Sequence, residues 1–439
     1  MKAKPIKVLG AAAVVAALLF TGCQASEPSP AANGGASQAA SGPASAPAAA
    51  EDRGPITFVQ GKDNNNVMQP LIDQWNAAHP DEKVTLKEQS DQADQQHDDL
   101  VQHFQAQSTD YDAVIVDVIW TAEFAAKGWL QELSGNYAVT TEGMLPATVD
   151  SGTYNGKLYT APFVTDGSIL YYRSDLVKTP PATWDELVAA CSIAKDNGME
   201  CYAGQFAKYE GLVCNFAEFV NTNGGTIVGP DGKTPTLDTP EAKAGLQQMV
   251  DGFKNGVFDK NSITYQEEQS RQAFESGKLL FLRNWPYVYS LASSDQESKV
   301  IGKFAVAPIP GMTAEKSGAS TLGGHNIAIS AFSQHKATAA DFIRFLQSPE
   351  TEKTMLEKAS NAPALASLYD DAALQKDFPY LPALKGSLSA AVPRPVSPFY
   401  PAISQAIQDN VYPALKGEKT VDQAMTDMQA AIQTAGAAS

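Results

Sequence analysis

The chain has 439 residues, of which 44% are hydrophobic and 18% are charged. This length exceeds what one hydrophobic core usually serves, and the composition is that of a globular protein, so we expect two lobes and exclude a disordered chain. The formal net charge of −17 at pH 7 argues against binding to nucleic acid, to polyanionic ligands or to an anionic lipid surface.

Residues 1–22 have the pattern of a secretory signal peptide. Three lysines precede the apolar run 8–20, which is too short to span a bilayer comfortably. Cys23 follows Thr21 and Gly22 as in a bacterial lipobox, although Phe20 stands where Leu is usual. We expect cleavage before Cys23 and attachment of two acyl chains, which together anchor a protein stably to a membrane. The alternative is an ordinary cleaved signal peptide beside an incidental cysteine.

Residues 23–53 are rich in Ala, Ser, Pro and Gly and have almost no large apolar side chain. Such a composition builds no core and behaves as a flexible linker. We interpret this segment as a tether that begins at the lipidated Cys23 and holds the folded part away from the membrane.

Strand and helix patterns alternate along residues 55–127. The expected strands are 55–59, 84–88 and 113–116, and the expected helices are 67–75, 90–107 and 121–127. This alternation predicts an α/β lobe with a largely parallel sheet. Ligands of such sheets bind at the carboxyl ends of the strands, where Asp117 and Trp120 follow the third strand. A carboxylate in this position is also a common helix cap, so Asp117 has two interpretations.

The rest of the chain also mixes strands and helices. Pro162 and Gly167 are expected to break the chain around Asp166, and the glycine-rich stretch 321–325 is expected to be a loop that lets backbone approach a ligand. Capping residues at Thr183 and Thr239 mark two helix starts. The expected strands are 169–172, 278–282, 304–308 and 326–330, and further helices are 266–276, 337–347, 348–359, 401–412 and 421–434.

The helix that follows Lys208 carries an aromatic ring and a carboxylate at its start. Its apolar residues fall at helical spacing, so one face packs inward, and Gly224 and Gly225 end it. Tyr209 and Glu210 lie in or just before the first turn, where unpaired N–H groups attract acceptors and negative charge. This pair suits a hydroxyl-rich ligand. The alternative is an ordinary core helix in which Tyr209 packs locally.

Three cysteines follow Cys23. In an exported protein the short span from Cys191 to Cys201 is the favoured disulfide, and Cys214, on the apolar side of its helix, is expected to be a buried free thiol. The sequence does not prove this connectivity. Its five histidines are scattered and no metal-ligand spacing or phosphate-binding loop occurs, so we expect no metal site and no cofactor.

Six motifs occur in a fixed order after residue 55. They are Val116–Trp120 with Glu123 and Phe124, Thr165–Gly167 with Tyr171–Arg173, Tyr209–Gly225, Trp285–Tyr287, Leu322–Gly324 and Arg394–Pro398. In these motifs the chain resembles the trehalose/maltose-binding branch of the extracellular sugar-binding proteins of ABC importers, which are family 1 solute-binding lipoproteins. The resemblance implies a two-lobed α/β clamshell of the type II periplasmic-binding-protein class. Each lobe is expected to be a mixed, mostly parallel sheet flanked by helices, with three crossings between the lobes.

The resemblance also implies lobe boundaries and sugar contacts. The N-lobe is expected at 54–165 and 322–368, and the C-lobe at 166–321 and 369–439. The implied contacts are Asp117, Asp166, Tyr209, Glu210, Trp285, Tyr287, Gly323, Gly324 and Arg394, with Asp63, Asn64, Gln89, Ser90 and Asp91 in the loops after the first two strands. His325, included in the site, stands where the family pattern has Trp, which removes one stacking surface and puts trehalose itself in question.

These residue types suit a sugar. Carboxylates accept strong hydrogen bonds from hydroxyl groups, and the apolar faces of sugar rings pack on aromatic rings. Arg394 is expected to orient a carboxylate or to donate directly, and its alternative is a surface salt bridge. Trp285 follows a strand beside Pro286, which favours a surface facing a cleft, and its alternative is a core position.

We therefore interpret the chain as a monomeric, lipid-anchored receptor on the outer face of the cytoplasmic membrane. It captures a disaccharide or short oligosaccharide and delivers it to the transmembrane subunits of an ABC permease. A secreted glycoside hydrolase is the alternative from another class, but a hydrolase needs two carboxyl groups roughly 5–9.5 Å apart across one bond, and no motif pairs carboxylates in that way. A peptide or polyamine receptor of the same fold is a third candidate, which the aromatic residues disfavour.

The lipobox generates a prediction about anchoring. Replacing Cys23 by serine removes the thiol that carries the acyl chain, so Cys23→Ser should move the protein from the membrane fraction to the soluble fraction without changing its sugar affinity. Cell fractionation followed by immunodetection measures this. A variant that still sediments with membranes contradicts the lipobox interpretation.

Overall fold

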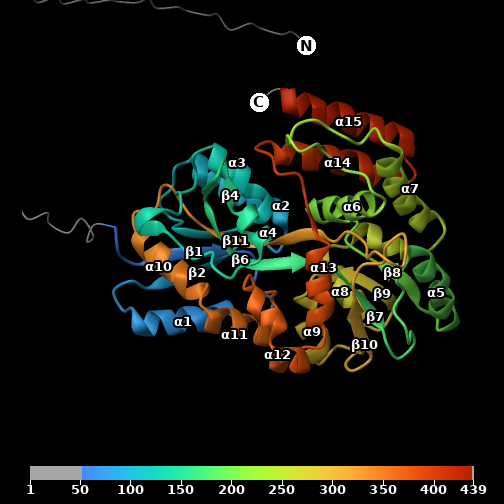
Figure 1. The fold of residues 1–439 in the computed structure, drawn as a ribbon, viewed down its shortest axis with the longest axis horizontal. Coiled ribbons are helices and arrows are strands. Elements are labelled where there is room, and N and C mark those ends of the chain that lie inside the picture. The colour runs from blue at the N-terminus through green and yellow to red at the C-terminus, as the bar shows by residue number, and fades with distance from the viewer. Residues whose placement is uncertain (1–51, 438–439) are drawn as a thin grey trace, which may run out of the picture. The chain divides into compact units, whose positions relative to one another are not determined.

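The computed structural model describes residues 52–437. The predicted signal peptide, Cys23 and the predicted tether before Asp52 lie outside the described residues. Within 52–437, none of the helices has the length and apolar character needed to cross a bilayer. The described residues form two α/β lobes, each built on its own sheet (Figure 1).

The first sheet combines strands from distant parts of the chain. Its strands are β1 (Ile56–Gln60), β2 (Val84–Glu88), β3 (Ala113–Asp117), β6 (Thr160–Gly167), β11 (Thr321–Ile329) and β12 (Val392–Pro393). Their order is β12-β11-β3-β1-β2, and β6 also pairs with β11. The three strands expected before residue 120 pair in parallel, and so do β11 and β12, whereas β11 runs antiparallel to β3 and β6. A separate hairpin joins β4 (Thr153–Tyr154) and β5 (Lys157–Leu158).

The second sheet is smaller. Its strands are β7 (Ile169–Arg173), β8 (Glu200–Ala203), β9 (Leu279–Asn284) and β10 (Phe304–Ala307), in the order β10-β7-β9-β8. It is mixed, as expected, but its antiparallel pairs outnumber its one parallel pair, because β7 runs opposite to both neighbours.

Helices cover both faces of each sheet. On the first lobe they are α1 (Met68–Ala78), α2 (Ala93–Gln105), α3 (Thr121–Ala126), α4 (Pro146–Ser151), α10 (Lys336–Leu346) and α11 (Pro349–Ala359). With the second sheet are α5 (Trp184–Asp196), α6 (Glu210–Thr222), α7 (Pro240–Lys254), α8 (Glu267–Glu275), α9 (Val288–Ser294), α12 (Ala372–Asp377), α13 (Leu381–Ser389), α14 (Tyr400–Leu415) and α15 (Val421–Ala437). The 3₁₀ turns are η1 (Val118–Trp120), η2 (Gly135–Tyr137), η3 (Lys260–Thr264) and η4 (Ala366–Asp370).

Alternating strand residues build a separate core on each face of the sheets. On β3, Ala113 and Ile115 face the core that holds α1, α10 and α11, whereas Val114 and Val116 face the core that holds α2 and α3. In the second lobe α5, α6, α7, α14 and α15 share one core, and α9, α12 and α13 share another. The two C-terminal helices therefore pack on the second lobe.

Two segments that were expected to be breaks are strands. β6 continues through Pro162, and β11 includes the stretch 321–325 that was expected to be a loop. Phe163 has no partner in the register between these strands, and this bulge is where a proline without an N–H group is tolerated. The pairing sets Asp166 opposite Gly323. The local signals were misleading because partner strands far away in the sequence hold both segments extended.

The expected disulfide is present. Cys191 of α5 and Cys201 of β8 are bonded, with Cα atoms 5.1 Å apart. Cys214 on α6 is free and buried. Thr183 and Thr239 cap α5 and α7 as predicted, each accepting a backbone hydrogen bond of 3.2 Å.

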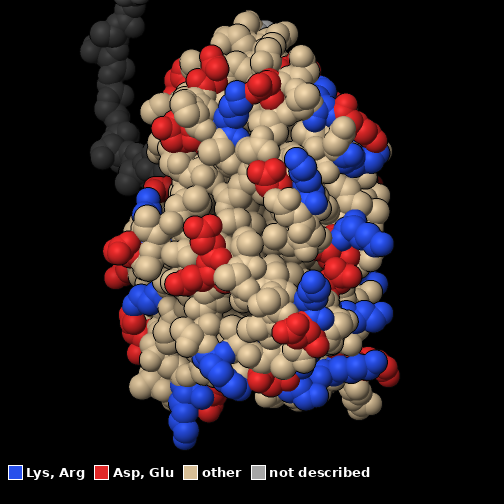
Figure 2. Space-filling view, turned by 90° about the vertical axis from the view of Figure 1, so that its right-hand side faces the viewer, with Lys and Arg blue, Asp and Glu red and all other residues tan. Residues whose placement is uncertain are grey.

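The surface carries charges of both signs. On the face of the second lobe shown in Figure 2, acidic and basic side chains are interspersed, and no continuous basic patch is visible there.

Candidate functional site

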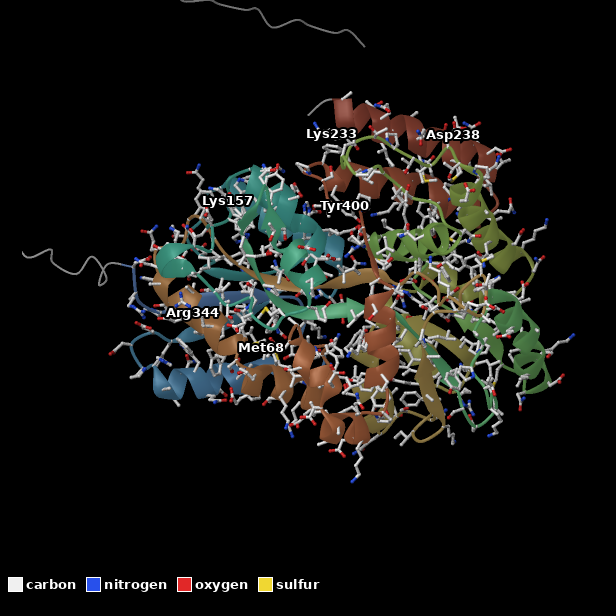
Figure 3. All side chains as sticks on the ribbon, viewed as in Figure 1. Met68, Lys157, Lys233, Asp238, Arg344 and Tyr400 are labelled. Atoms are coloured by element: carbon white, nitrogen blue, oxygen red, sulfur yellow. A yellow bond between two sulfur atoms is a disulfide. The ribbon has the colours of Figure 1, made fainter. Side chains whose placement is uncertain are left out.

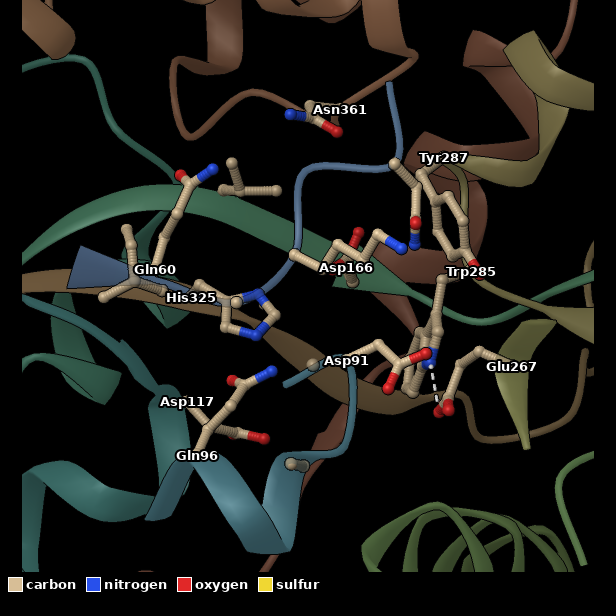
Figure 4. Close-up of a pocket in the computed structure, with 18 of the residues that line it drawn as sticks. Gln60, Asp91, Gln96, Asp117, Asp166, Glu267, Trp285, Tyr287, His325 and Asn361 are labelled. Carbon is tan, nitrogen blue, oxygen red and sulfur yellow. Dashed lines mark hydrogen bonds between the residues drawn. The ribbon is translucent and has the colours of Figure 1, made fainter. Parts of the chain in front are cut away.

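One cavity of about 280 Å³ lies where the two lobes meet. Its walls come from the loops after β1 and β2, the end of β3, β6 with β11, the starts of α6 and α8, and the turn after β9 (Figure 4). Thirteen of the fifteen residues predicted for a ligand site line it: Asp63, Asn64, Asp91, Asp117, Asp166, Tyr209, Glu210, Trp285, Tyr287, Gly323, Gly324, His325 and Arg394. Gln89 and Ser90 do not line it, and the Gln89 amide donates instead to Asp99 at 2.6 Å.

Arg394 links the two lobes through buried ion pairs. Its Nη2 donates to Asp117 Oδ1 at 2.7 Å, and its Nη1 donates to Glu210 Oε1 at 2.6 Å. The side chain is 3% exposed, so the surface salt-bridge alternative is wrong. The helix-cap interpretation of Asp117 is confirmed, because the same Oδ1 also accepts from the Ile119 N–H and caps η1. Asp117 also lines the cavity, so the ligand interpretation stays a prediction.

Both carboxylate oxygens of Glu210 accept hydrogen bonds from protein groups. Besides Arg394, its carboxylate accepts from the Tyr400 hydroxyl at 2.5 Å and from the Ser404 hydroxyl at 2.6 Å (Tyr400 is labelled in Figure 3). Its backbone N–H donates to Asp94 of α2 at 3.2 Å, which fixes the first turn of α6 against the first lobe. Burial raises the pKa of Glu210, and Arg394 opposes this shift. Glu210 therefore positions the other groups.

Asp166 and His325 are open to the cavity. Among residues 52–437 neither side chain receives or donates a hydrogen bond, and both face the same space as Trp285 (Figure 4). Burial, followed by the charge of Asp117, raises the pKa of Asp166 to about 7, and Arg283 opposes the rise. Burial lowers the pKa of His325, so its ring is neutral at pH 7 and offers one donor and one acceptor.

Two glutamates at the start of α8 hold the aromatic wall. Glu267 accepts from the Tyr209 hydroxyl at 2.7 Å and from the Trp285 indole N–H at 3.5 Å. Glu268 accepts from the Tyr287 hydroxyl at 2.6 Å. The sequence analysis did not identify either glutamate, because each acts on rings that belong to other elements.

The two tryptophans at strand ends have opposite environments. Trp285 is half-buried and lines the cavity, so its core alternative is wrong. Trp120, which also follows a strand, is 4% exposed and packs near Phe124 and His97 outside the cavity. Tyr209 is buried and also contributes to the cavity wall, so neither of its two interpretations excludes the other.

Gly323 has little room for a side chain, and Gly324 has none. A Cβ atom on Gly323 would lie 3.0 Å from the Trp285 ring. Gly324 has a φ of +107°, and a Cβ atom there would lie 2.3 Å from the Val164 carbonyl oxygen. These glycines let β11 pass directly beneath the tryptophan.

The loop after β1 contributes one structural and one open side chain. The Asp63 carboxylate accepts from the Met68 N–H at 2.7 Å and so stabilises the start of α1. The Asn64 amide makes no hydrogen bond within the described range, and Asp91 is exposed at the rim. The prediction also missed Gln60, Gln96 and Asn361. Gln60 ends β1, so the rule that ligands bind at carboxyl ends was enough to find it.

Comparison with known proteins identifies similar sequences among bacterial solute-binding proteins. The sequence profile of the bacterial extracellular solute-binding proteins matches residues 60–353. A probable ABC transporter-binding protein of Deinococcus radiodurans is 33% identical over 330 residues, which cover 72% of this chain and 77% of that protein.

Solved structures show the same likeness. Maltose-bound MalE3 of T. maritima has a TM-score of 0.81 and 35% identity, covering 87% of this chain and 99% of that chain. The GacH receptor of Streptomyces glaucescens, solved unliganded and with acarbose, has a TM-score of 0.77 and 23% identity, covering 87% and 98%, and this likeness concerns the fold alone.

The open carboxylate of Asp166 generates a prediction about pH. Its pKa is raised from 3.8 to about 7 in the folded protein, so folding favours the protonated form. Stability is therefore highest below the ordinary pKa and falls as the pH rises from about 4 to about 7. In the ligand-free protein, Asp166→Asn should raise the free energy of unfolding at pH 8 by on the order of 1–3 kcal/mol, and the gain should shrink toward pH 4.

Urea denaturation at several pH values measures this effect. Asp91→Asn changes an exposed carboxylate at the rim of the same cavity and should give curves close to those of the parent protein. An Asp166→Asn variant that is less stable than the parent at pH 8 contradicts the prediction.

Proposed function

This chain belongs to the bacterial extracellular solute-binding proteins, non-enzymatic receptors of ABC transporters, and we propose that its ligand is a neutral disaccharide or short oligosaccharide held between the two lobes. Its fold is the two-lobed type II periplasmic-binding-protein fold expected from the sequence. The observation that carries the proposal is the cavity, in which open polar groups face an aromatic ring.

The open groups match a polyol. Asp166 offers a carboxyl group without a protein partner among residues 52–437, and neutral His325 offers a donor and an acceptor. The indole ring of Trp285 supplies a flat apolar surface for a sugar ring. A concave site with an aromatic wall and a few convergent polar groups is the general form of a small-molecule site.

The charges disfavour an anionic ligand. Both terminal nitrogens of Arg394 already donate to carboxylates of the protein. Lys62, the other Lys or Arg that lines the cavity within residues 52–437, is exposed at its rim. A sugar acid or sugar phosphate would meet the carboxyl group of Asp166, and the buried Arg283 and Arg394 are already paired with protein carboxylates.

The size of the cavity and one relative support a short glucoside. The volume of about 280 Å³ is near the lower end of the range for ligand sites, which favours a disaccharide over a long chain. MalE3, at 35% identity, was solved with maltose. We therefore place maltose first among candidates, and trehalose after it because His325 stands where the family pattern has Trp.

The remaining parts of the proposal concern transport. The lobes, with boundaries at 54–165 plus 322–368 and 166–321 plus 369–439, close on the sugar by a hinge. The closed receptor, a monomer anchored through Cys23 at the outer face of the cytoplasmic membrane, then delivers the sugar to the transmembrane subunits of its permease. A hydrolase is disfavoured because Asp117, Glu210 and Glu267 are each held by protein donors.

A thermal-shift screen tests the ligand class. A ligand that binds only the folded state stabilises it by about 2.7 kcal/mol at a hundred times Kd. Maltose, trehalose and maltotriose should raise Tm, with maltose among the strongest, whereas glucuronate, spermidine and a tripeptide should not. Stabilisation by spermidine or the tripeptide alone contradicts the proposal.

Trp285 should act on binding far more than on stability. Trp285→Ala removes the stacking surface and should weaken maltose binding by about 2–4 kcal/mol in calorimetry, as buried aromatic anchors do. Stability should fall much less, because a residue on a cavity wall leaves no core void.

Trp120 provides the matched control. Trp120→Ala opens a void in the core and should lower the denaturant midpoint while the folded fraction keeps its affinity for maltose. If Trp285→Ala behaves like Trp120→Ala, the proposed site is misplaced.

A further inference from the structure

The ring of Trp285 rests on a buried arginine. The guanidinium carbon of Arg283 lies 4.0 Å from the ring centroid, and Arg283 is 0% exposed. Its Nε donates to Glu218 Oε2 at 2.9 Å, and its Nη2 donates to Glu218 Oε1. Its Nη1 donates to Gln205 Oε1 at 2.7 Å. Each guanidinium nitrogen therefore has a partner, and the plane of the group is fixed beneath the ring.

Glu218 also bonds to the segments that pass between the sheets. The hydroxyl of Ser168, between β6 and β7, donates to Glu218 Oε1, and the Thr321 N–H at the start of β11 donates to the same atom at 3.2 Å. The hydroxyls of Ser168 and Ser320 are 2.9 Å apart. Two connections between the lobes therefore converge on one carboxylate.

One face of α6 holds the segment that leads into β11. Cys214, Glu218 and Thr222 are spaced four residues apart and so lie on one face of the helix. The Cys214 carbonyl accepts from the Thr321 hydroxyl at 2.9 Å, and the Thr222 hydroxyl accepts from the Ala319 N–H at 3.0 Å. The strand that enters the first sheet is thus fixed to α6 at three successive turns.

Neither member of the ion pair lines the cavity. The pair therefore does not contact a ligand in the cavity. Arg283 nevertheless lies directly behind the Trp285 ring, which lines the cavity. Replacing a buried ion pair by apolar groups often leaves stability unchanged, so stability alone does not explain why charges occupy this place. The geometry of the pair explains why charges occupy this place. The guanidinium fork of Arg283 and the carboxylate of Glu218 together determine where the Trp285 ring and the segments that cross between the lobes lie.

We propose that Arg283 and Glu218 are positioning residues for ligand capture. The pair holds the Trp285 ring in its stacking position and, through Ser168 and Thr321, ties that position to the arrangement of the two lobes. Sugar affinity then depends on an ion pair that the sugar does not touch. This inference rests on the proposed sugar-binding function for its affinity readout.

Affinity of conservative variants tests the proposal. Arg283→Lys keeps the charge but loses the fork, and Glu218→Gln keeps the shape but loses the charge. Calorimetry with maltose on fully folded protein should show at least a tenfold rise in Kd for each variant. In the Trp285→Ala background the effect of Arg283→Lys on Kd should largely disappear, because the arginine acts through the ring.

Asp112→Asn is the matched control. Asp112 is a buried carboxylate that precedes β3, at the end of the strand away from Asp117, and it accepts from the Thr57 N–H at 2.8 Å and the Ser333 hydroxyl at 2.6 Å. This variant should lower stability and leave Kd unchanged. If Arg283→Lys and Glu218→Gln lower stability but leave Kd unchanged in the same way, the pair is only structural and the proposal is overturned.

A second readout needs no ligand. The emission of Trp285 is obtained by subtracting the spectrum of a Trp285→Phe partner from that of each protein. The wavelength of this emission should shift in Arg283→Lys and in Ser168→Ala. Ser168→Ala is the milder variant, because it keeps the ion pair and removes only one hydrogen bond to Glu218, so it is the variant to measure if the charge variants do not fold. An unchanged Trp285 emission in both variants overturns the positioning role. A shifted emission with no maltose binding to the parent protein supports the positioning role and places the failure in the proposed function.

Discussion

The buried guanidinium of Arg394 is the interaction on which the arrangement of this site depends. It contacts Asp117 at the end of β3 in the first lobe and Glu210 at the start of α6 in the second. Removing one partner of a buried ion pair destabilises a protein by about 3–5 kcal/mol. The folded state therefore needs both carboxylates at the guanidinium of Arg394, which brings β3 and α6 together although they are far apart in the sequence. The carboxyl end of β3 and the first turn of α6 are thereby held together where both line one cavity.

The side chains of the cavity differ in what they already bind. Glu210 and Glu267 accept hydrogen bonds from protein groups, so they hold rings and helices in place. Asp166 and His325 have no such partners within the described residues, so they are left for a ligand. A buried acceptor without a partner is unfavourable, and the hydroxyl groups of a sugar remove that penalty when they bind. The proposed selectivity for a neutral polyol rests on this division.

The elements with clear local signals were predicted well. β1, β2 and β3 lie where their apolar patterns placed them, and the helix caps at Thr183 and Thr239 formed as expected. β6 and the first half of β11 were predicted as breaks, because Pro162 and the glycines are local signals for turns. Pairing between these two strands overrode those signals, with a bulge at Phe163 beside the proline. Trp120 and Trp285 both follow strands, yet one is core and the other lines the cavity, since burial depends on neighbours that the local sequence does not contain.

By itself the sequence determined the α/β class, the family resemblance and a set of thirteen residues that the fold brings to one cavity, because apolar periodicity, caps and ordered motifs are properties of short segments. Only the tertiary structure decided which of those residues are open to a ligand and which support the others. The Tyr400–Glu210 and Tyr209–Glu267 hydrogen bonds join residues 190 and 58 positions apart. Such bonds form only when the whole chain has packed, and each of them occupies an acceptor that the local sequence leaves free.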